Sequence, residues 1–138
     1  MTINTEFLEK CIATLEKSYQ YLLQSSTESI EYEMYRNSLV KSFEITLEQA
    51  GKLLKKYMTP YFATKKQADK LMFKDIFRYA HKHGLITEEE ANRWLLYRDN
   101  RNSTAHDYGQ AFAEETVGLA KTLMEDARKI VELINHGA

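Results

Sequence analysis

The sequence predicts an all-α fold, an up-and-down antiparallel bundle of four or five helices, and three observations favour it. Apolar residues recur at spacings of three and four through most of the 138 residues. Turn formers are scarce, with five glycines and one proline, whereas an all-β fold needs them about every ten residues. A chain of this length buries roughly two-thirds of the surface that its unfolded form exposes. We therefore expect a single domain over residues 1–138.

The first half of the chain is expected to form two helices. Residues 5–24 carry an apolar stripe made of Phe7, Leu8, Cys11, Ile12, Leu15, Tyr19, Leu22 and Leu23. Ser25 and Glu28 have the spacing of a capping box and predict the start of a second helix. That helix should run to about Met58, because Pro60 removes a backbone donor. Its buried side should consist of Leu39, Phe43, Leu47, Ala50, Leu54 and Tyr57.

Three more helices are expected in the second half. Thr64 and Gln67 have capping-box spacing for a third helix that ends at Gly84. Its apolar residues are Ala68, Met72, Ile76, Phe77 and Ala80. Thr87 and Glu90 form the clearest capping box, and the fourth helix should end near residues 101–102 with Ala91, Trp94 and Leu95 toward the core. A fifth helix over about 111–134 has a seam at Ala113, Val117, Ala120, Met124, Ala127, Val131 and Ile134.

Charge is unevenly distributed along a chain whose formal net charge is -1. Residues 1–40 have a net charge of -3, residues 41–84 of +6 and residues 85–138 of -4. The overall balance argues against a general cationic nucleic-acid binder. The basic middle segment is either a solvated helix face or a surface that attracts RNA or an acidic partner.

Apolar runs and cysteine content indicate the compartment. The chain has no long apolar run and no basic start followed by an apolar stretch, so we expect neither a membrane span nor a signal peptide. The lone Cys11 cannot form an internal disulfide, which fits a reducing compartment. A cytoplasmic protein is expected.

The stretch from Arg98 to Gly109 is the least apolar part of the chain, and it falls between the fourth and fifth expected helices. Arg101 offers a permanently charged fork suited to phosphate. His106 exchanges a proton near neutral pH, and Tyr108 supplies a hydroxyl. Asn102, Ser103 and Thr104 can orient these groups or contact a nucleotide. Arg98, one turn before Arg101, either shares a phosphate-facing surface or pairs with Asp99 and solvent. The alternative is an ordinary helix end and loop.

Other patterns point less clearly to chemistry. His81 and His83 are two residues apart and face different sides of a helix, which favours a solvated helix end over a metal site. The sequence has no E-x-x-H, H-E-x-x-H, C-x-x-C or Gly-rich phosphate loop. We therefore expect no metal and no cofactor. Cys11 and Trp94 are interpreted as core residues.

The order Arg101-Asn102, then His106, then Tyr108 resembles the R-x4-H-x-Y motif of the HEPN superfamily, the higher eukaryotes and prokaryotes nucleotide-binding domain. Two further blocks are similar to the nucleotidyltransferase substrate-binding protein family, a HEPN branch. They are Lys41-Ser42-Phe43-Glu44-Ile45-Thr46-Leu47-Glu48 with Lys52-Leu53-Leu54-Lys55-Lys56-Tyr57-Met58, and Gly84-Leu85-Ile86 with Trp94. Where that family commonly has an Ala-Trp pair, this chain has Gln49-Ala50-Gly51.

This resemblance implies a HEPN-like helical bundle that forms a homodimer and pairs its motifs across a cleft. It implies a partner, a minimal nucleotidyltransferase encoded nearby. In several HEPN branches the paired arginine and histidine act as a metal-independent ribonuclease, the toxin of a toxin–antitoxin system. The nucleotidyltransferase can transfer AMP to the motif tyrosine, which here would be Tyr108.

Three hypotheses for function follow. The first is a ribonuclease subunit that uses Arg101 and His106 and is held in check by its nucleotidyltransferase partner. The second is a non-catalytic subunit that presents a nucleotide or substrate to that partner. The third is a structural helical dimer whose polar stretch is only a loop.

Overall fold

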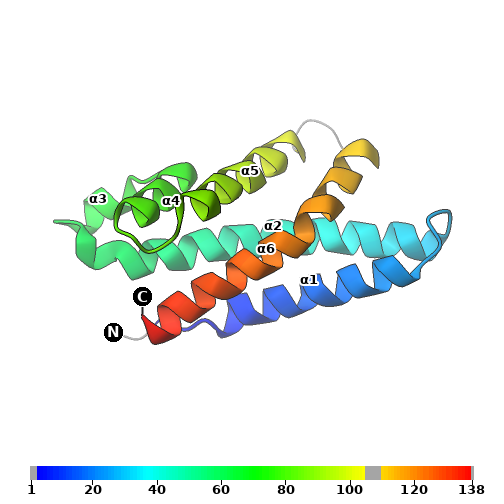
Figure 1. Cartoon of the computed structure of the whole chain (residues 1–138), viewed down its shortest axis with the longest axis horizontal. Helices are drawn as coiled ribbons and strands as arrows, with labels where there is room; N and C mark the ends of the chain where they lie inside the picture. Colours follow the sequence, from blue (N-terminus) through cyan, green and yellow to red (C-terminus); the bar gives the residue numbers. More distant parts are fainter. Residues whose placement is uncertain (1–2, 105–109, 138) are drawn as a thin grey trace.

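The computed structural model describes the backbone of residues 3–104 and 110–137, with side chains for residues 3–100 and 111–137, and these form a helical bundle (Figure 1). The helices within this part of the chain are α1 (Glu6–Gln24), α2 (Ile30–Met58), the 3-10 helix η1 (Thr59–Tyr61), α3 (Lys65–Asp69), α4 (Phe73–Lys82), α5 (Glu88–Thr104) and α6 (Gln110–His136). The long helices α1, α2, α5 and α6 alternate in direction (Figure 1). The predicted all-α, up-and-down architecture is confirmed. No described helix is long and apolar enough to cross a membrane.

The 29-residue helix α2 is the longest described helix and contacts α1, α4, α5 and α6. Helices α1 and α6 pack against α2 and against each other, whereas α4 and α5 pair on its other side (Figure 1). The start of α1 and the end of α6 lie side by side, because Asn135 Nδ2 donates to Thr5 Oγ1 at 3.2 Å. Helix α5 also packs against α6 and so joins the two sides of the bundle.

Aromatic rings fill the centre of the core between α2, α4 and α5. The fully buried Trp94 stacks on Phe77 with ring centroids 4.6 Å apart. Tyr97 meets Trp94 edge-on at 5.4 Å and Phe43 at 6.0 Å. The expected core position of Trp94 is confirmed, and so is that of Cys11, which is buried on α1. Burial raises the pKa of the Cys11 thiol above its ordinary value.

The expected seam of α6 is only partly correct. Ala113, Ala120, Met124 and Ala127 are buried as predicted, but Val117, Val131 and Ile134 are only partly buried. Further residues that the predicted seam left out are also buried, namely Phe112, Thr116, Leu123, Asp126, Ile130 and Leu133. Because α6 contacts α1, α2 and α5, it buries a face wider than a two-helix seam.

The second helix begins at Ile30, so the prediction that Ser25 opens it is wrong. Ser25 instead closes α1, and its hydroxyl donates to the Tyr21 carbonyl at 2.8 Å. A serine hydroxyl readily bonds to the carbonyl four residues back, and here that bond takes Ser25 out of the capping role. Ser29 is the N-cap, and its Oγ accepts from the Tyr32 amide at 3.1 Å.

The expected third helix is two helices, α3 and α4. Thr64 caps α3 as predicted, since its Oγ1 accepts from the Gln67 amide at 3.1 Å. The next amides bond only three residues back, Lys70 to Gln67 and Leu71 to Ala68, which tightens and ends the turn. Met72, predicted to be buried, lies in the break and is 71% exposed.

Gly84 ends α4 in the left-handed conformation, with φ +74°, and the Leu85 amide donates back to the Ala80 carbonyl at 2.9 Å. We expect Gly84→Ala to lower the free energy of unfolding by about 1 kcal/mol, because a Cβ strains this conformation. Gly118 lies within α6, and nothing would touch an added Cβ. Gly118→Ala should therefore stabilise by about 1 kcal/mol. Urea unfolding of the two variants tests both predictions. A gain in stability for Gly84→Ala would contradict the role given to the left-handed conformation of Gly84.

Candidate functional site at the end of α5

A strong cap fixes the start of the helix that leads to the motif. The Thr87 amide donates to Glu90 Oε1, and the Glu90 amide donates to Thr87 Oγ1, both at 3.1 Å. This confirms the predicted capping box. Helix α5 then runs to Thr104, two residues beyond the expected end.

The predicted site residues fall on both sides of the limit of the described chain. The backbone of Arg101, Asn102 and Ser103 forms the last turns of α5, while their side chains lie outside the described residues. His106 and Tyr108 also lie outside the described residues. The structure therefore describes the helices α5 and α6 on either side of the motif, and the roles of these five residues stay predictions.

A buried ionic cluster holds α5 against α6. Asp126 of α6 is 2% exposed and accepts from Arg93 Nε and Nη2, each at 2.8 Å. The hydroxyl of the buried Tyr97 donates to Asp126 Oδ2 at 2.6 Å. Burial and the Asp126 carboxylate raise the pKa of Tyr97 far above its ordinary value, so the phenol stays protonated and donates. The bonds to Asp126 likewise raise the pKa of Arg93.

Arg101 follows this cluster on the same row of α5. Arg93, Tyr97 and Arg101 are spaced by four residues, so the backbone places them along one face of the helix. The first two contact α6 through Asp126. By backbone position, residue 101 is therefore the next in this row of α5.

The two helix ends that flank residues 105–109 are both fixed to the bundle. The buried Asn100 of α5 donates through Nδ2 to Thr116 Oγ1 of α6 at 3.0 Å. Glu114 of α6 accepts from the Tyr32 hydroxyl at 2.8 Å and forms an ion pair with Arg36 at 3.3 Å, both from α2. The segment with His106 and Tyr108 thus joins two anchored ends.

Arg98 is held on the α2 and α4 side of α5. Its guanidinium forms an ion pair with Glu48 and lies 4.5 Å from the centroid of the Phe73 ring. Gly51 allows this ring to come close, since a Cβ there would lie 2.6 Å from Phe73 Cε2. Gly51, in the Gln49-Ala50-Gly51 stretch, therefore leaves room for the ring that contacts the Arg98 guanidinium.

Sequence reasoning missed Asp126 and Tyr97, the two buried members of the ionic cluster. A signal for Asp126 was present, because this acidic residue falls three residues after Leu123 and four before Ile130, within a row of apolar residues on the last helix. A buried carboxylate needs a cationic or hydrogen-bonding partner. No spacing or motif in the sequence indicates that this partner is Arg93.

Known proteins similar to this chain identify its family. A sequence model of the family described as nucleotidyltransferase substrate binding protein like matches residues 4–136. The chain belongs to this family. A relative from Haemophilus influenzae named probable ribonuclease HepT is 26% identical over 112 residues, which cover 78% of this chain and 75% of the relative.

A solved structure has the same fold. It is HI0074 from Haemophilus influenzae, described as revealing the fold of a substrate-binding domain of a nucleotidyltransferase. The match has a TM-score of 0.68 and covers 91% of this chain and 99% of that one, at 24% identity. The helical architecture is thus shared by this member of the family and HI0074.

Proposed function

We propose that this chain is a HEPN-type ribonuclease subunit that works as a homodimer with a minimal nucleotidyltransferase as its partner. The observation that carries the proposal is the Arg101, His106 and Tyr108 motif in a chain that matches the nucleotidyltransferase substrate-binding family over residues 4–136. The name of the HepT relative supports the ribonuclease activity. The description of HI0074 as a substrate-binding domain of a nucleotidyltransferase supports the partner.

The proposed reaction needs two proton-transfer groups and no metal. A base takes the proton from the 2′-hydroxyl of RNA, and an acid protonates the departing 5′-oxygen. One His106 from each subunit of a two-fold dimer supplies both groups. Arg101 from each subunit stabilises the charge on the phosphorane-like transition state. The products are a 2′,3′-cyclic phosphate and a 5′-hydroxyl.

Supporting roles are proposed for three residues beside the catalytic pair. Asn102 and Ser103 follow Arg101 in the last turns of α5 and offer hydrogen-bonding groups to a nucleotide. Arg98 lies one turn before Arg101, and its contacts with Glu48 and Phe73 hold its charge near that end of the helix. A phosphate bound there would compete with Glu48 for the guanidinium.

Tyr108 is the proposed site of AMP transfer. A phosphate attached two residues from His106 would add negative charge near Arg101 and block access for RNA. We expect that co-expression with the neighbouring nucleotidyltransferase raises the intact mass of this chain in units of AMP. The mass increase should disappear in Tyr108→Phe. An unchanged mass in the wild-type complex would contradict the modification.

The second candidate function is a non-catalytic subunit that binds a nucleotide or substrate for the nucleotidyltransferase. The description of the family as substrate binding favours it. In this case Arg101 and the hydroxyl groups of α5 would bind phosphate without a chemical step.

One experiment separates the two candidates. Purified protein is incubated with RNA in a chelator, and cleavage and binding are followed in the same samples. We expect cleavage that depends on Arg101 and His106. RNA that stays intact while the protein binds a nucleotide would favour the second candidate.

A further inference from the structure

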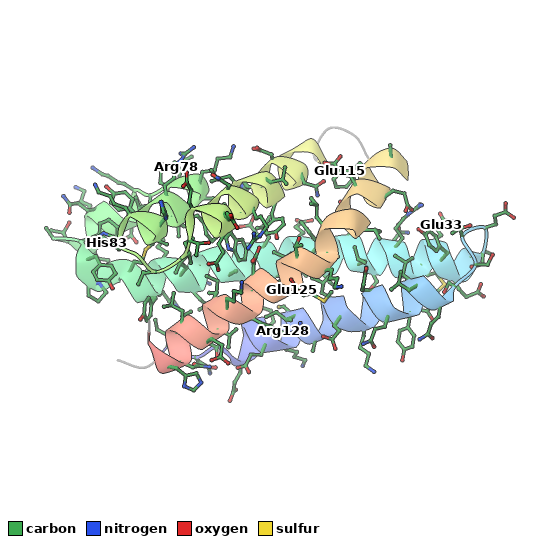
Figure 2. All side chains as sticks on the ribbon, viewed as in Figure 1. Glu33, Arg78, His83, Glu115, Glu125 and Arg128 are labelled. Carbon is green, nitrogen blue, oxygen red and sulfur yellow. The ribbon has the colours of Figure 1, made fainter. Side chains whose placement is uncertain are left out.

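Helix α4 carries a row of three cations, Lys74, Arg78 and Lys82. They are spaced by four residues, so the helical rise puts neighbours about 6 Å apart along one face. Arg78 and Lys82 are exposed, and the side chain of Lys74 is 34% exposed. Figure 2 shows Arg78 on the outer side of α4, away from α1. The row is therefore open to a ligand along its length.

The acidic neighbours of the row are open to solvent, since the side chains of Asp99 and Asp75 are 58% and 40% exposed. Lys74 Nζ lies 2.5 Å from Asp99 Oδ1, and Arg78 lies 3.3 Å from Asp75 Oδ1. Exposed pairs of this kind contribute little and are screened by salt. Lys82 makes no ion pair with any residue that the structure describes. A phosphate can thus compete for all three cations.

An exposed pair of aromatic rings lies at the far end of the row. Tyr61 and His83 stack with ring centroids 4.5 Å apart and an interplanar angle of 12°, and Tyr61 is 48% exposed. Lys82 Nζ lies 5.7 Å from the ring of Tyr79, which in turn stacks on His83 at 6.2 Å. Flat rings open to solvent beside cations are the features on which unpaired bases stack.

The near end of the row reaches the end of α5. Helix α4 runs antiparallel to α5 (Figure 1), and the contact of Lys74 with Asp99 lies two residues before Arg101. The row therefore extends from Tyr61 and His83 toward the motif.

The geometry points to a binding track for single-stranded RNA, in which Lys74, Arg78 and Lys82 contact successive phosphates and the Tyr61–His83 pair stacks a base. This inference rests on the proposed function, because it supplies the path by which RNA reaches Arg101. An acidic protein surface would be attracted by the cations alone. The open ring pair favours nucleic acid, and the net charge of +6 on residues 41–84 agrees with it.

The test measures binding of a short fluorescein-labelled single-stranded RNA by fluorescence anisotropy over a range of salt concentrations. The parent is the full chain with His106→Ala, which keeps the RNA intact. Adding Arg78→Gln and Lys82→Gln should weaken binding about tenfold and lower the salt slope by about 1.4, at about 0.7 per lost phosphate contact. Adding Tyr61→Ala should weaken binding at least about fivefold with little change in salt slope.

The matched control adds Lys121→Gln and Lys129→Gln instead, which remove two exposed lysines from α6. Equal losses in the control and the α4 variant would overturn the track, because binding would then follow overall charge. The track would also be overturned if the α4 variant bound RNA as tightly as the parent. The same holds if the α4 changes weakened binding of the nucleotidyltransferase partner and left RNA binding unchanged. A parent that binds no RNA would overturn it as well.

Cleavage is measured separately on the chain with a native His106. RNA cleavage that is unaffected by the α4 and Tyr61 changes would refute the track and leave the proposed function intact. Track-dependent RNA binding with no cleavage by any variant would support the track and refute the ribonuclease.

Discussion

Replacing Asp126 by alanine is expected to lower the free energy of unfolding by about 2–4 kcal/mol, because the buried Tyr97 hydroxyl is left without its acceptor and the partly exposed Arg93 loses its carboxylate partner. Arg93 would lose both of its 2.8 Å bonds, and the buried Tyr97 hydroxyl would lose its acceptor. The packing of α5 against α6 would weaken when these hydrogen bonds are lost. Urea or thermal unfolding measures the loss.

Glu125→Ala is the matched control for Asp126→Ala. Glu125 is the preceding residue on α6, carries the same charge and is exposed, and it forms no ion pair within the described part of the chain. Its removal should change stability by less than about 0.5 kcal/mol. Equal stability of the two variants would contradict the role given to the buried cluster.

His106→Ala is expected to slow RNA cleavage by a factor of about 10²–10⁴, the usual contribution of a general acid or base. Both proton-transfer groups of the proposed dimer are copies of this residue, so one substitution removes the pair. Initial rates of cleavage with a chelator present measure the effect.

His136→Ala controls for the loss of an imidazole. His136 lies at the end of α6, is largely exposed and has no role in the proposed site. Its removal should leave the rate unchanged, and both variants should keep the helical circular dichroism of the parent. A His106→Ala protein that cleaves at the parental rate would show that the chemistry lies elsewhere.

The bundle was predictable from the sequence because its main signals are local. The stripe of residues 5–24, the Thr87–Glu90 box and the stop at Gly84 each depend on neighbours within one or two turns. The errors arose where two local structures compete. Ser25 has the spacing of an N-cap, but a serine hydroxyl can also bond to a carbonyl at the end of the preceding helix. Its bond to the Tyr21 carbonyl places Ser25 at the end of α1.

The frame of the site was harder to predict because its contacts are distant in sequence. Asp126 binds Arg93 across 33 residues, and Arg98 pairs with Glu48 across 50. The partners lie on different helices, so the periodicity within one helix does not indicate which residues pair. Arg101 could be singled out because the motif is short and lies at the end of α5.

The chemical identity of the RNA ends produced with a chelator present tests the central claim most directly. The proposed mechanism predicts a 2′,3′-cyclic phosphate and a 5′-hydroxyl, and a substrate with 2′-deoxynucleotides at the cleaved positions should stay intact. These products should vanish in Arg101→Ala. Intact RNA, or products that carry a 5′-phosphate, would contradict the claim.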